Sequence, residues 1–352
     1  MFCFTLMRTI LTCTAILFLC CPGQGVYAQY KNLVFEGGGI RGISYAGAIK
    51  ALEEKGKLAE VERTAGSSVG ALAALMVSLG YTAREIDSLM ASLRLQSFND
   101  GHYFFIGGQN RLRKRFGWYR GNRFEKWVER LIAVKTGDPY MTFADLTALS
   151  RNSRVFKQFY CTGTDLSAQQ AAVLGAETTP GMHVSTAVRI SMSIPLYFEA
   201  VLLDDHYQRV HSVRDAANCH VWVDGGLLLN YPIGVFDSCP HIPRHVCCRE
   251  GIANPYTLGL KLERPEQISN YVKDSLLAPY RITSLKEYIA SFYNIAFETL
   301  NGAGNLQAER GRTVYISTGH ISPRIKRVSP QQKLLLYQNG YKAVLATIGG
   351  PY

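Results

Sequence analysis

The sequence contains no internal repeat, no low-complexity run and no linker that would divide it. These absences exclude repeat architectures and long disordered segments, and they favour one folded domain. Charged residues are also few, at 18% of the chain, whereas hydrophobic residues make up 47%. A chain of 352 residues with this composition can bury a full hydrophobic core, so we expect an ordinary globular protein.

Acidic residues are in the minority. The chain has 27 Asp and Glu against 38 Lys and Arg, which gives a formal net charge of +11. Positive charge attracts a protein to anionic lipid and other polyanionic surfaces, although net charge alone more often reflects solubility. The charge therefore gives only weak support to a substrate at a membrane surface.

The first 28 residues contain one charge, at Arg8, and are nearly all apolar from Ile10 to Cys20. They end in the pattern Val26 to Ala28, which is typical of a signal-peptide cleavage site. An uncleaved membrane anchor is the alternative, but the apolar run is shorter than the roughly 20 residues that span a bilayer. We expect cleavage after Ala28, which lowers the net charge from +11 to +10. The mature protein would then be exported to the periplasm, the cell envelope or the medium.

The cysteines lack a standard metal-binding spacing, and the residues before Cys20 lack the small side chain typical of a lipid-anchor site. Five cysteines follow the predicted signal peptide: Cys161, Cys219, Cys239, Cys247 and Cys248. Four of them share a short stretch with His220, His241 and His245. In an exported protein such a stretch favours a disulfide over zinc, and an odd cysteine is left over. We expect no functional metal and no cofactor.

Strand patterns alternate with helix patterns over residues 29–352, which we take as one domain. Strands are expected at 31–36, 61–65, 153–162, 169–174, 220–224, 256–262 and 313–317, and helices at 42–56, 69–79, 183–191, 283–300 and from 330 onward. This order predicts an α/β fold in which a mainly parallel central sheet lies between helices, as a three-layer α/β/α sandwich.

Residues 95–123 form the least regular stretch, in which arginine and lysine alternate with aromatic residues. Such a mixture can bind nucleic acid, lie on a lipid headgroup layer or form a long surface loop. Export argues against nucleic acid. The surface loop and the membrane-facing segment both stay open.

The motif Gly66-Ser67-Ser68-Val69-Gly70 fits G-x-S-x-G between a predicted strand and a predicted helix. The chain must turn sharply there, which exposes the residue at the centre of the motif. Ser68 is therefore the candidate nucleophile, whereas Ser67 is explained by hydrogen bonding within the turn. A serine hydroxyl also needs a base, and acyl transfer needs donors for the oxyanion.

Residues 35–42 read FEGGGIRG and follow the first predicted strand. Consecutive glycines bring backbone N–H groups against an anion, which can be a phosphate or a transient oxyanion. The loops after the first two strands of a parallel sheet lie at the same edge, so the amides of Gly37, Gly38 and Gly39 can face Ser68 and form an oxyanion hole.

Arg41 and Gly42 are candidate supporting residues beside this loop. The arginine can contribute positive charge or bind a substrate phosphate, and a salt bridge that holds the loop explains it equally well.

Asp224 is the candidate base, because the sequence HVWVDGG drives a buried strand into a glycine turn at that residue. We expect its carboxylate at the same sheet edge as Ser68. An Asp that caps the DGG turn is the alternative. The histidines lie in polar or loop contexts, so no histidine is assigned to a catalytic triad.

The segments EGGGIRG, GSSVG and DGGLLLNYP resemble, in order and spacing, those of the patatin-like phospholipase family. The resemblance extends over residues 31–348 and implies a lipid acyl hydrolase, a phospholipase A or other carboxylic ester hydrolase, with a Ser-Asp dyad instead of a triad. It implies Ser68 as nucleophile, Asp224 as general base, an acyl-enzyme intermediate and no metal. Glu36 stands where many members have Asp, and the segment from Cys219 to Cys248 is longer than expected.

Two other functions stay open. A dinucleotide-dependent oxidoreductase could use Gly37, Gly39 and Gly42 as a G-x-G-x-x-G loop, but Glu62 lies too early in the second strand to bind the ribose. A catalytically silent lipid-binding or storage protein could keep the same fold. We expect a phospholipid or other acyl-ester lipid as partner, with peripheral contact to an anionic membrane and no nucleic acid.

Overall fold

The computed structural model describes residues 29–101, 104–215, 217–238, 252–273, 277–285, 287–288, 291, 295, 309–321 and 328–348. The predicted signal peptide, Cys239, Cys247 and Cys248, and most of the helix expected at 283–300 lie outside these residues. Within the described part of the chain, no helix is both long and apolar enough to cross a membrane.

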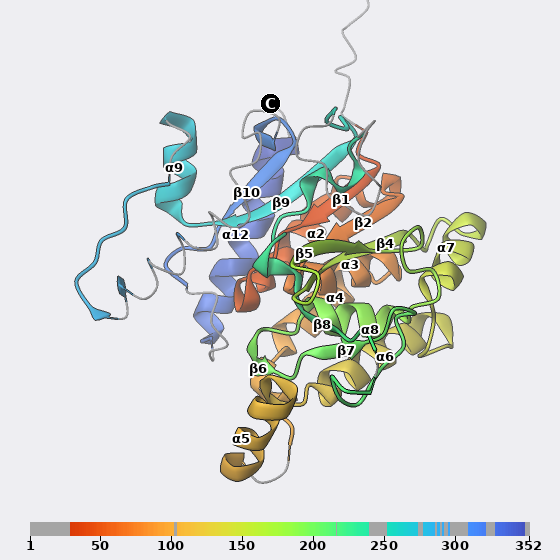
Figure 1. Cartoon of the computed structure of the whole chain (residues 1–352). Helices are drawn as coiled ribbons and strands as arrows, with labels where there is room; N and C mark the ends of the chain where they lie inside the picture. The colour runs from red at the N-terminus through yellow and green to blue at the C-terminus, as the bar shows by residue number, and fades with distance from the viewer. Residues whose placement is uncertain are drawn as a thin grey trace, which may run out of the picture.

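The centre of the molecule is an eight-stranded sheet in which seven strands follow the order β10-β9-β1-β2-β4-β8-β7 and β5 pairs with β4 (Figure 1). Their bounds are β1 Asn32–Phe35, β2 Arg63–Gly66, β4 Gln158–Asp165, β5 Gln170–Leu174, β7 Val201–Leu203, β8 His220–Asp224, β9 Thr257–Glu263 and β10 Thr313–Ser317. Neighbours from β10 to β4 are parallel, whereas β5 and β8 run antiparallel to β4. The predicted mainly parallel α/β sheet is confirmed.

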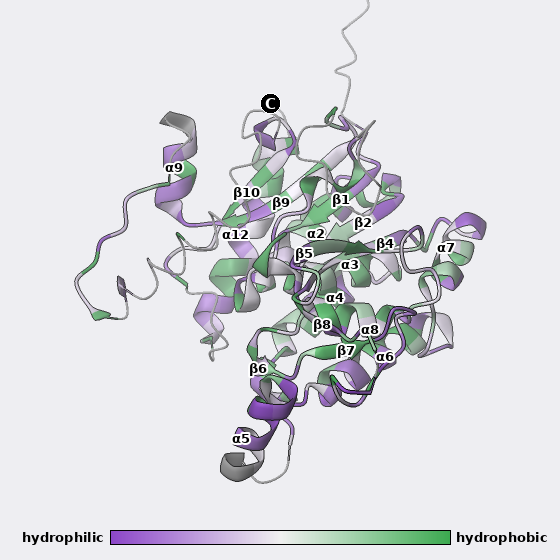
Figure 2. Ribbon diagram, in the orientation of Figure 1, coloured by the Kyte–Doolittle hydropathy of each residue, from purple (hydrophilic) through white to green (hydrophobic). Residues whose placement is uncertain are grey.

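Helices cover the face of the sheet to which Leu33 and Phe35 point, and these residues belong to the large hydrophobic core. The helices with described bounds are α2 Ser44–Glu54, α3 Val69–Ser78, α4 Ala83–Ser92, α5 Phe104–Arg115, α6 Asn122–Thr136, α7 Phe143–Asn152, α8 Val184–Ser191, α9 Pro265–Lys273 and α12 Pro330–Ile348. Hydrophobic residues gather on the sheet and α3, whereas the described part of α5 is largely hydrophilic (Figure 2).

The opposite face of the sheet has a thinner cover. Val34 and Ala65 pack there against Ile233 and Phe236, which belong to the short helix Ile233–Phe236 (η5). Helix α9 lies on the same side, where the hydroxyl of its Tyr271 donates to Glu263 in β9 at 2.8 Å.

The stretch 95–123 is more regular than expected. It contains the short helix Leu95–Phe98 (η3), helix α5 and strand β3 Gly117–Tyr119, which pairs in parallel with β6 Leu196–Phe198 as a separate two-stranded sheet. Gly108, which weakens the helical pattern, packs so tightly that a Cβ there would lie 2.5 Å from the Trp118 ring. The glycine serves a tertiary contact, which local periodicity does not reveal.

Candidate active site

Ser68 lies at the turn between β2 and α3, with a backbone φ of 52° and ψ of −126°. A positive φ in a residue other than glycine costs about 1–3 kcal/mol and persists only where the surroundings enforce it. The flanking glycines allow this turn: a Cβ on Gly66 would lie 2.3 Å from the Gly70 carbonyl oxygen, and one on Gly70 would lie 2.4 Å from that of Phe35. The G-x-S-x-G sequence thus folds into the sharp strand-to-helix turn that its pattern predicts.

The structure brings Ser68 and Asp224 into direct contact. The Ser68 hydroxyl donates to Asp224 Oδ2 at 2.8 Å, and the Gly226 amide donates to the other carboxylate oxygen at 2.7 Å. Both Ser68 and Asp224 are buried. Burial raises the pKa of Asp224 to about 7, although the hydrogen bonds from Gly226 and Ser68 oppose the shift.

Asp224 lies at the same sheet edge as Ser68, as expected, but for a different structural reason. Strand β8 runs antiparallel to β4, so the rule for parallel strand ends does not apply to it. Gly66 of β2 is level with Cys161 of β4, and β4 continues past that point to Gly163, which is opposite Asp224. Pairing with this overhang of β4 brings the end of β8 level with the turn at Ser68.

The glycine loop lies beside Ser68, but its three amides are not equivalent. The Gly37 amide donates to the Asn230 carbonyl oxygen at 3.0 Å. The Gly38 and Gly39 amides have no acceptor among the described residues. A Cβ on Gly37 would lie 3.2 Å from Ser68 Cβ, so a side chain there would crowd the hydroxyl.

Arg41 and Gly42 both support the loop. Arg41 Nε donates to the Gly38 carbonyl oxygen at 3.3 Å and forms no ion pair with a described carboxylate, so the guanidinium holds the loop through its backbone. Gly42 allows close packing on α3, since a Cβ there would lie 2.5 Å from Val69 Cγ2. These contacts fix the direction of the amides that precede them.

Sequence reasoning missed several residues that build the site. Asn230 accepts the Gly37 amide on its carbonyl oxygen, and its side-chain amide donates to the Gly37 carbonyl oxygen at 3.1 Å. The Ser191 hydroxyl accepts the Ser68 amide at 2.9 Å, and the Ser193 carbonyl oxygen accepts the Asp224 amide at 2.9 Å. The segments DGGLLLNYP and AVRISMSIPLYFEAV contain these residues, but the partners are far away in the chain.

Arg189 is a further buried residue behind the site. Its guanidinium donates to the Ser193 hydroxyl and to the carbonyl oxygens of Arg120 and Glu199. Burial lowers the pKa of Arg189 to about 10. A buried cation that is held mainly by backbone carbonyls fixes the segment that follows α8, and with it the backbone partner of Asp224.

The other polar candidates lie apart from this pair. The Ser67 hydroxyl is buried and has no hydrogen-bond partner among the described residues. Of the histidines that the structure describes, none is hydrogen-bonded to Ser68 or Asp224; His220 instead contacts Asp165 at 2.6 Å and Asp205 at 3.1 Å.

Cys161 and Cys219 are free. Across the described ranges, no group of three or more His, Cys, Asp or Glu residues is arranged to hold a metal ion.

Glu62, the acid considered for a dinucleotide site, precedes β2 and pairs with Lys31 at 2.6 Å. The glycine loop follows the other end of the neighbouring strand β1. This separation argues against a ribose contact from Glu62.

The fold and site together define an α/β protein in which a buried serine with a strained backbone is hydrogen-bonded to a carboxyl group, and a glycine loop lies beside the serine. The model of the patatin-like phospholipase family matches residues 33–237, and the chain belongs to that family of lipid hydrolases.

Several known proteins are similar to this chain. It is 33% identical to the uncharacterized protein YqhO of Bacillus subtilis (strain 168) over 214 residues, which cover 60% of this chain and 68% of YqhO. It is 24% identical to the probable lipid hydrolase 463L of Invertebrate iridescent virus 6 over 207 residues, or 58% of this chain and 63% of that protein.

A solved structure supports the fold. The crystal structure of VipD from Legionella pneumophila is similar with a TM-score of 0.60 and 18% sequence identity, over 91% of this chain and 67% of that one. At this identity the similarity concerns the fold alone.

Proposed function

We propose that this protein hydrolyses carboxylic ester bonds of lipids, as a phospholipase A or related acyl hydrolase, with Ser68 as nucleophile and Asp224 as general base. The observation that carries the proposal is the 2.8 Å hydrogen bond from the Ser68 hydroxyl to the buried Asp224 carboxyl. Membership of a family of lipid hydrolases supports the substrate class. The predicted signal peptide supports export as the location.

The reaction follows from the groups present. Ser68 Oγ attacks the acyl carbonyl carbon while its proton passes to Asp224 Oδ2, and the amides of Gly38 and Gly39 donate to the developing oxyanion. Collapse of the tetrahedral intermediate breaks the ester bond, and Asp224 returns the proton to the leaving alcohol. A water molecule then repeats these steps on the acyl-enzyme, which releases the fatty acid and restores the Ser68 hydroxyl.

The pKa of Asp224 suits this role. An efficient base has a pKa near the working pH, and burial raises that of Asp224 to about 7. Only the ionised carboxylate can accept the serine proton, so kcat/KM for a soluble ester should increase with pH up to about 7 and then level off.

The proposal is tested by fluorophosphonate labelling with peptide mapping, together with hydrolysis of a short-chain p-nitrophenyl ester. Ser68→Ala should abolish both labelling and turnover. Asp224→Asn should lower turnover by about 10²- to 10⁴-fold, because it removes the base but keeps the side-chain shape.

Ser67→Ala is the matched control, since that neighbouring hydroxyl is buried without a partner. It should keep both the label and the rate. Wild-type turnover in Ser68→Ala or Asp224→Asn would refute the dyad. A wild-type chain that binds lipid but hydrolyses no ester of any chain length would instead support a silent lipid-binding protein.

A further inference from the structure

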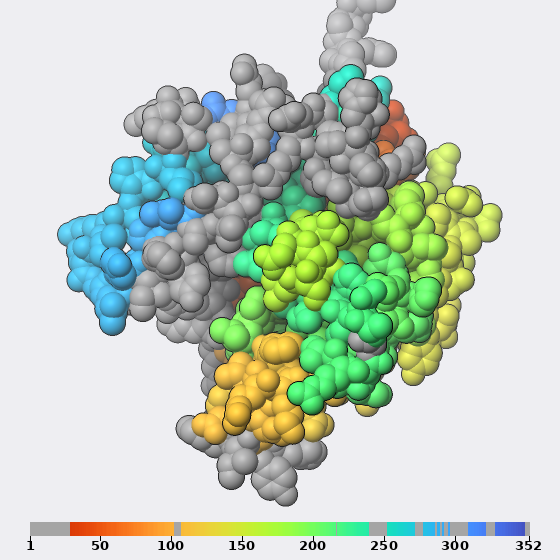
Figure 3. All heavy atoms as spheres, viewed as in Figure 1, coloured from red at the N-terminus to blue at the C-terminus, as the bar shows by residue number. Residues whose placement is uncertain are grey.

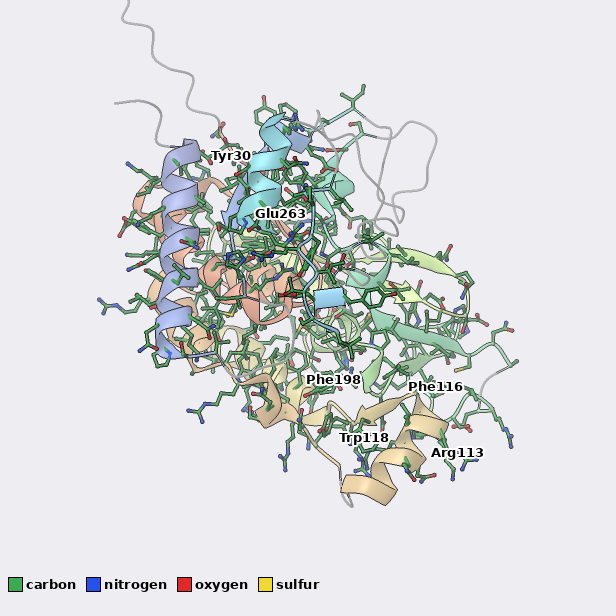
Figure 4. The ribbon with its side chains drawn as sticks, turned by 90° about the vertical axis from the view of Figure 1, so that its left-hand side faces the viewer. Tyr30, Arg113, Phe116, Trp118, Phe198 and Glu263 are labelled. Carbon is green, nitrogen blue, oxygen red and sulfur yellow. The ribbon has the colours of Figure 1, made fainter. Side chains whose placement is uncertain are left out.

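Helix α5, strand β3 and strand β6, with Phe116 and Arg120, form a protrusion on the body of the molecule. We call it the basic protrusion. In Figure 4 Arg113, Phe116 and Trp118 lie together on it, at the end of the molecule opposite Tyr30. The space-filling view shows the described atoms of α5 as an exposed orange lobe (Figure 3).

Two bulky apolar residues of the basic protrusion are exposed and strained at the same place. Phe116 has a φ of 63° and Leu196 a φ of 66°, although neither is glycine. Leu196 is opposite Gly117, the residue after Phe116, in the ladder between β3 and β6. Their exposed fractions are 39% for Phe116 and 68% for Leu196. Burial of these two side chains in the core does not account for their strained backbone, because both side chains are exposed. A function at the surface is the better explanation.

The sequence around Phe116 carries charge of one sign. From Gly101 to Phe124 the sequence has no acid and six basic residues: Arg111, Arg113, Lys114, Arg115, Arg120 and Arg123. Arg113 and Lys114 are exposed and form no ion pair with a described carboxylate. Glu199, the acid at the base of the protrusion, is mostly buried and is surrounded by Arg111, Arg115, Arg120 and Arg189.

The basic protrusion is continuous with the candidate active site. The Ser68 hydroxyl contacts Met192 Sδ at 3.6 Å, and the chain continues from Met192 through Pro195 to Leu196. Leu196 is thus four residues along the chain from the methionine that contacts the residue proposed to attack the ester.

We propose that the basic protrusion is the surface by which this protein docks on an anionic lipid bilayer, with Phe116 and Leu196 inserted among the headgroups and Arg113 and Lys114 paired with lipid phosphates. The docking proposal rests on the proposed function, because docking would bring the lipid substrate to the active site. Its test does not, because vesicle binding is measured without hydrolysis. Basic charge beside exposed apolar side chains is the combination that binds such an interface.

The test is cosedimentation of the Ser68→Ala chain with phosphatidylcholine vesicles that contain or lack phosphatidylglycerol. Because this variant does not depend on turnover, binding is measured separately from hydrolysis. We expect binding to the anionic vesicles only. The pair Arg113→Gln and Lys114→Gln should weaken it by about fivefold for each charge removed.

Phe116→Gly and Leu196→Gly separate a docking role from a structural one. Glycine adopts a positive φ without strain, which offsets the packing that is lost with each side chain, so each variant should unfold at a temperature close to that of the parent. Each should nevertheless bind the anionic vesicles about tenfold more weakly, because the inserted side chain is gone.

Arg151→Gln with Arg154→Gln is the charge-matched control, since both residues are exposed and lie in or just after α7, away from the basic protrusion. This control should bind as the parent does. Equal loss in the control, or unchanged binding in the protrusion variants, would overturn the proposal. Absence of binding to any vesicle would also overturn it and point to a protein partner. Vesicle binding by a chain that hydrolyses no ester would reject the proposed function and keep the docking surface.

Discussion

At the scale of a single residue, the carboxyl of Asp224 makes the stability of the folded protein depend on pH. An unfolded chain has its Asp pKa near the usual value of about 3.9, whereas burial in the folded protein raises the pKa of Asp224 to about 7. Between these values the folded state binds the proton more tightly than the unfolded state. This residue therefore makes the protein less stable as the pH increases from about 4 to about 7.

Asp224→Asn removes this dependence. At pH 8 the variant should be more stable than the wild type by up to about 4 kcal/mol, because it no longer buries a charge. Most of the advantage should be lost near pH 4, where the folded carboxyl is protonated and the unfolded one is about half protonated. Urea unfolding at both pH values measures the difference. A variant that is less stable than the wild type at pH 8 would contradict the burial argument.

At the scale of elements, the strand, turn and helix around Ser68 depend on close backbone packing. Gly70 in the first turn of α3 lies against the end of β1, and a Cβ there would come within 2.5 Å of the carbonyl oxygens of both Phe35 and Glu36. Backbone cannot move aside as a flexible side chain can. The glycine loop begins directly after Glu36, so a displacement there reaches the loop beside Ser68.

Gly70→Ala should therefore affect both stability and turnover. We expect a loss of about 1–3 kcal/mol in the free energy of unfolding, as for other overpacked sites, and at least a tenfold lower kcat/KM. Gly181→Ala is the control, because no atom lies within 4 Å of a Cβ at that position. Thermal unfolding and ester hydrolysis of both variants test the expectation, which fails if the two alanine variants behave alike.

The elements differ in how far the sequence reveals them. The strands that end at Phe35 and Gly66 and the helix that follows Ser68 were predictable, because turn chemistry and apolar periodicity are local. The final helix was predictable too: its capping box has the Gln332 amide on the Ser329 hydroxyl at 3.2 Å and the Ser329 amide on Gln332 Oε1 at 3.0 Å.

Features that depend on distant partners were not predictable. The residue pattern of β8 does not reveal whether the strand pairs in parallel or antiparallel. Its antiparallel direction was therefore not predicted, although the position of Asp224 was. The Gly37 amide depends on Asn230, which lies 193 residues further along the chain. The export prediction concerns residues outside the described part and stays a prediction.

At the scale of the whole molecule, the family match ends at residue 237, yet later segments hold the site in place. Strand β9 pairs with β1, and the Leu262 amide of β9 donates to Glu36 at 2.6 Å, directly before the glycine loop. Helix α12 packs on α2, where a Cβ on Gly340 would lie 1.9 Å from the Ser44 carbonyl oxygen. The C-terminal part is thus an integral part of the core.

Gly340→Ala should consequently destabilise the whole protein, although the residue is remote from Ser68 in sequence. The added methyl group must push α12 from α2, which we expect to lower the free energy of unfolding by about 1–3 kcal/mol. Gln338→Ala on the exposed side of α12 is the control and should have little effect. Chemical unfolding monitored by circular dichroism measures both. Equal stability of the two variants would show that the helices separate without cost.

The short pairing of β8 with β4 makes the site sensitive to errors of folding. Three pairs form the ladder, Gly163–Asp224, Thr164–Val223 and Asp165–Trp222, and the Leu166 amide donates to the Val221 carbonyl oxygen just beyond it at 2.9 Å. A slip of one residue turns every side chain of a strand to the other face, so Asp224 would point away from Ser68 while most of the core stayed intact. The contact between the Ser68 and Asp224 side chains therefore reports on correct alignment of β8. An activity assay that depends on this contact would detect misaligned molecules, whereas solubility and helix content would not distinguish them from the native protein.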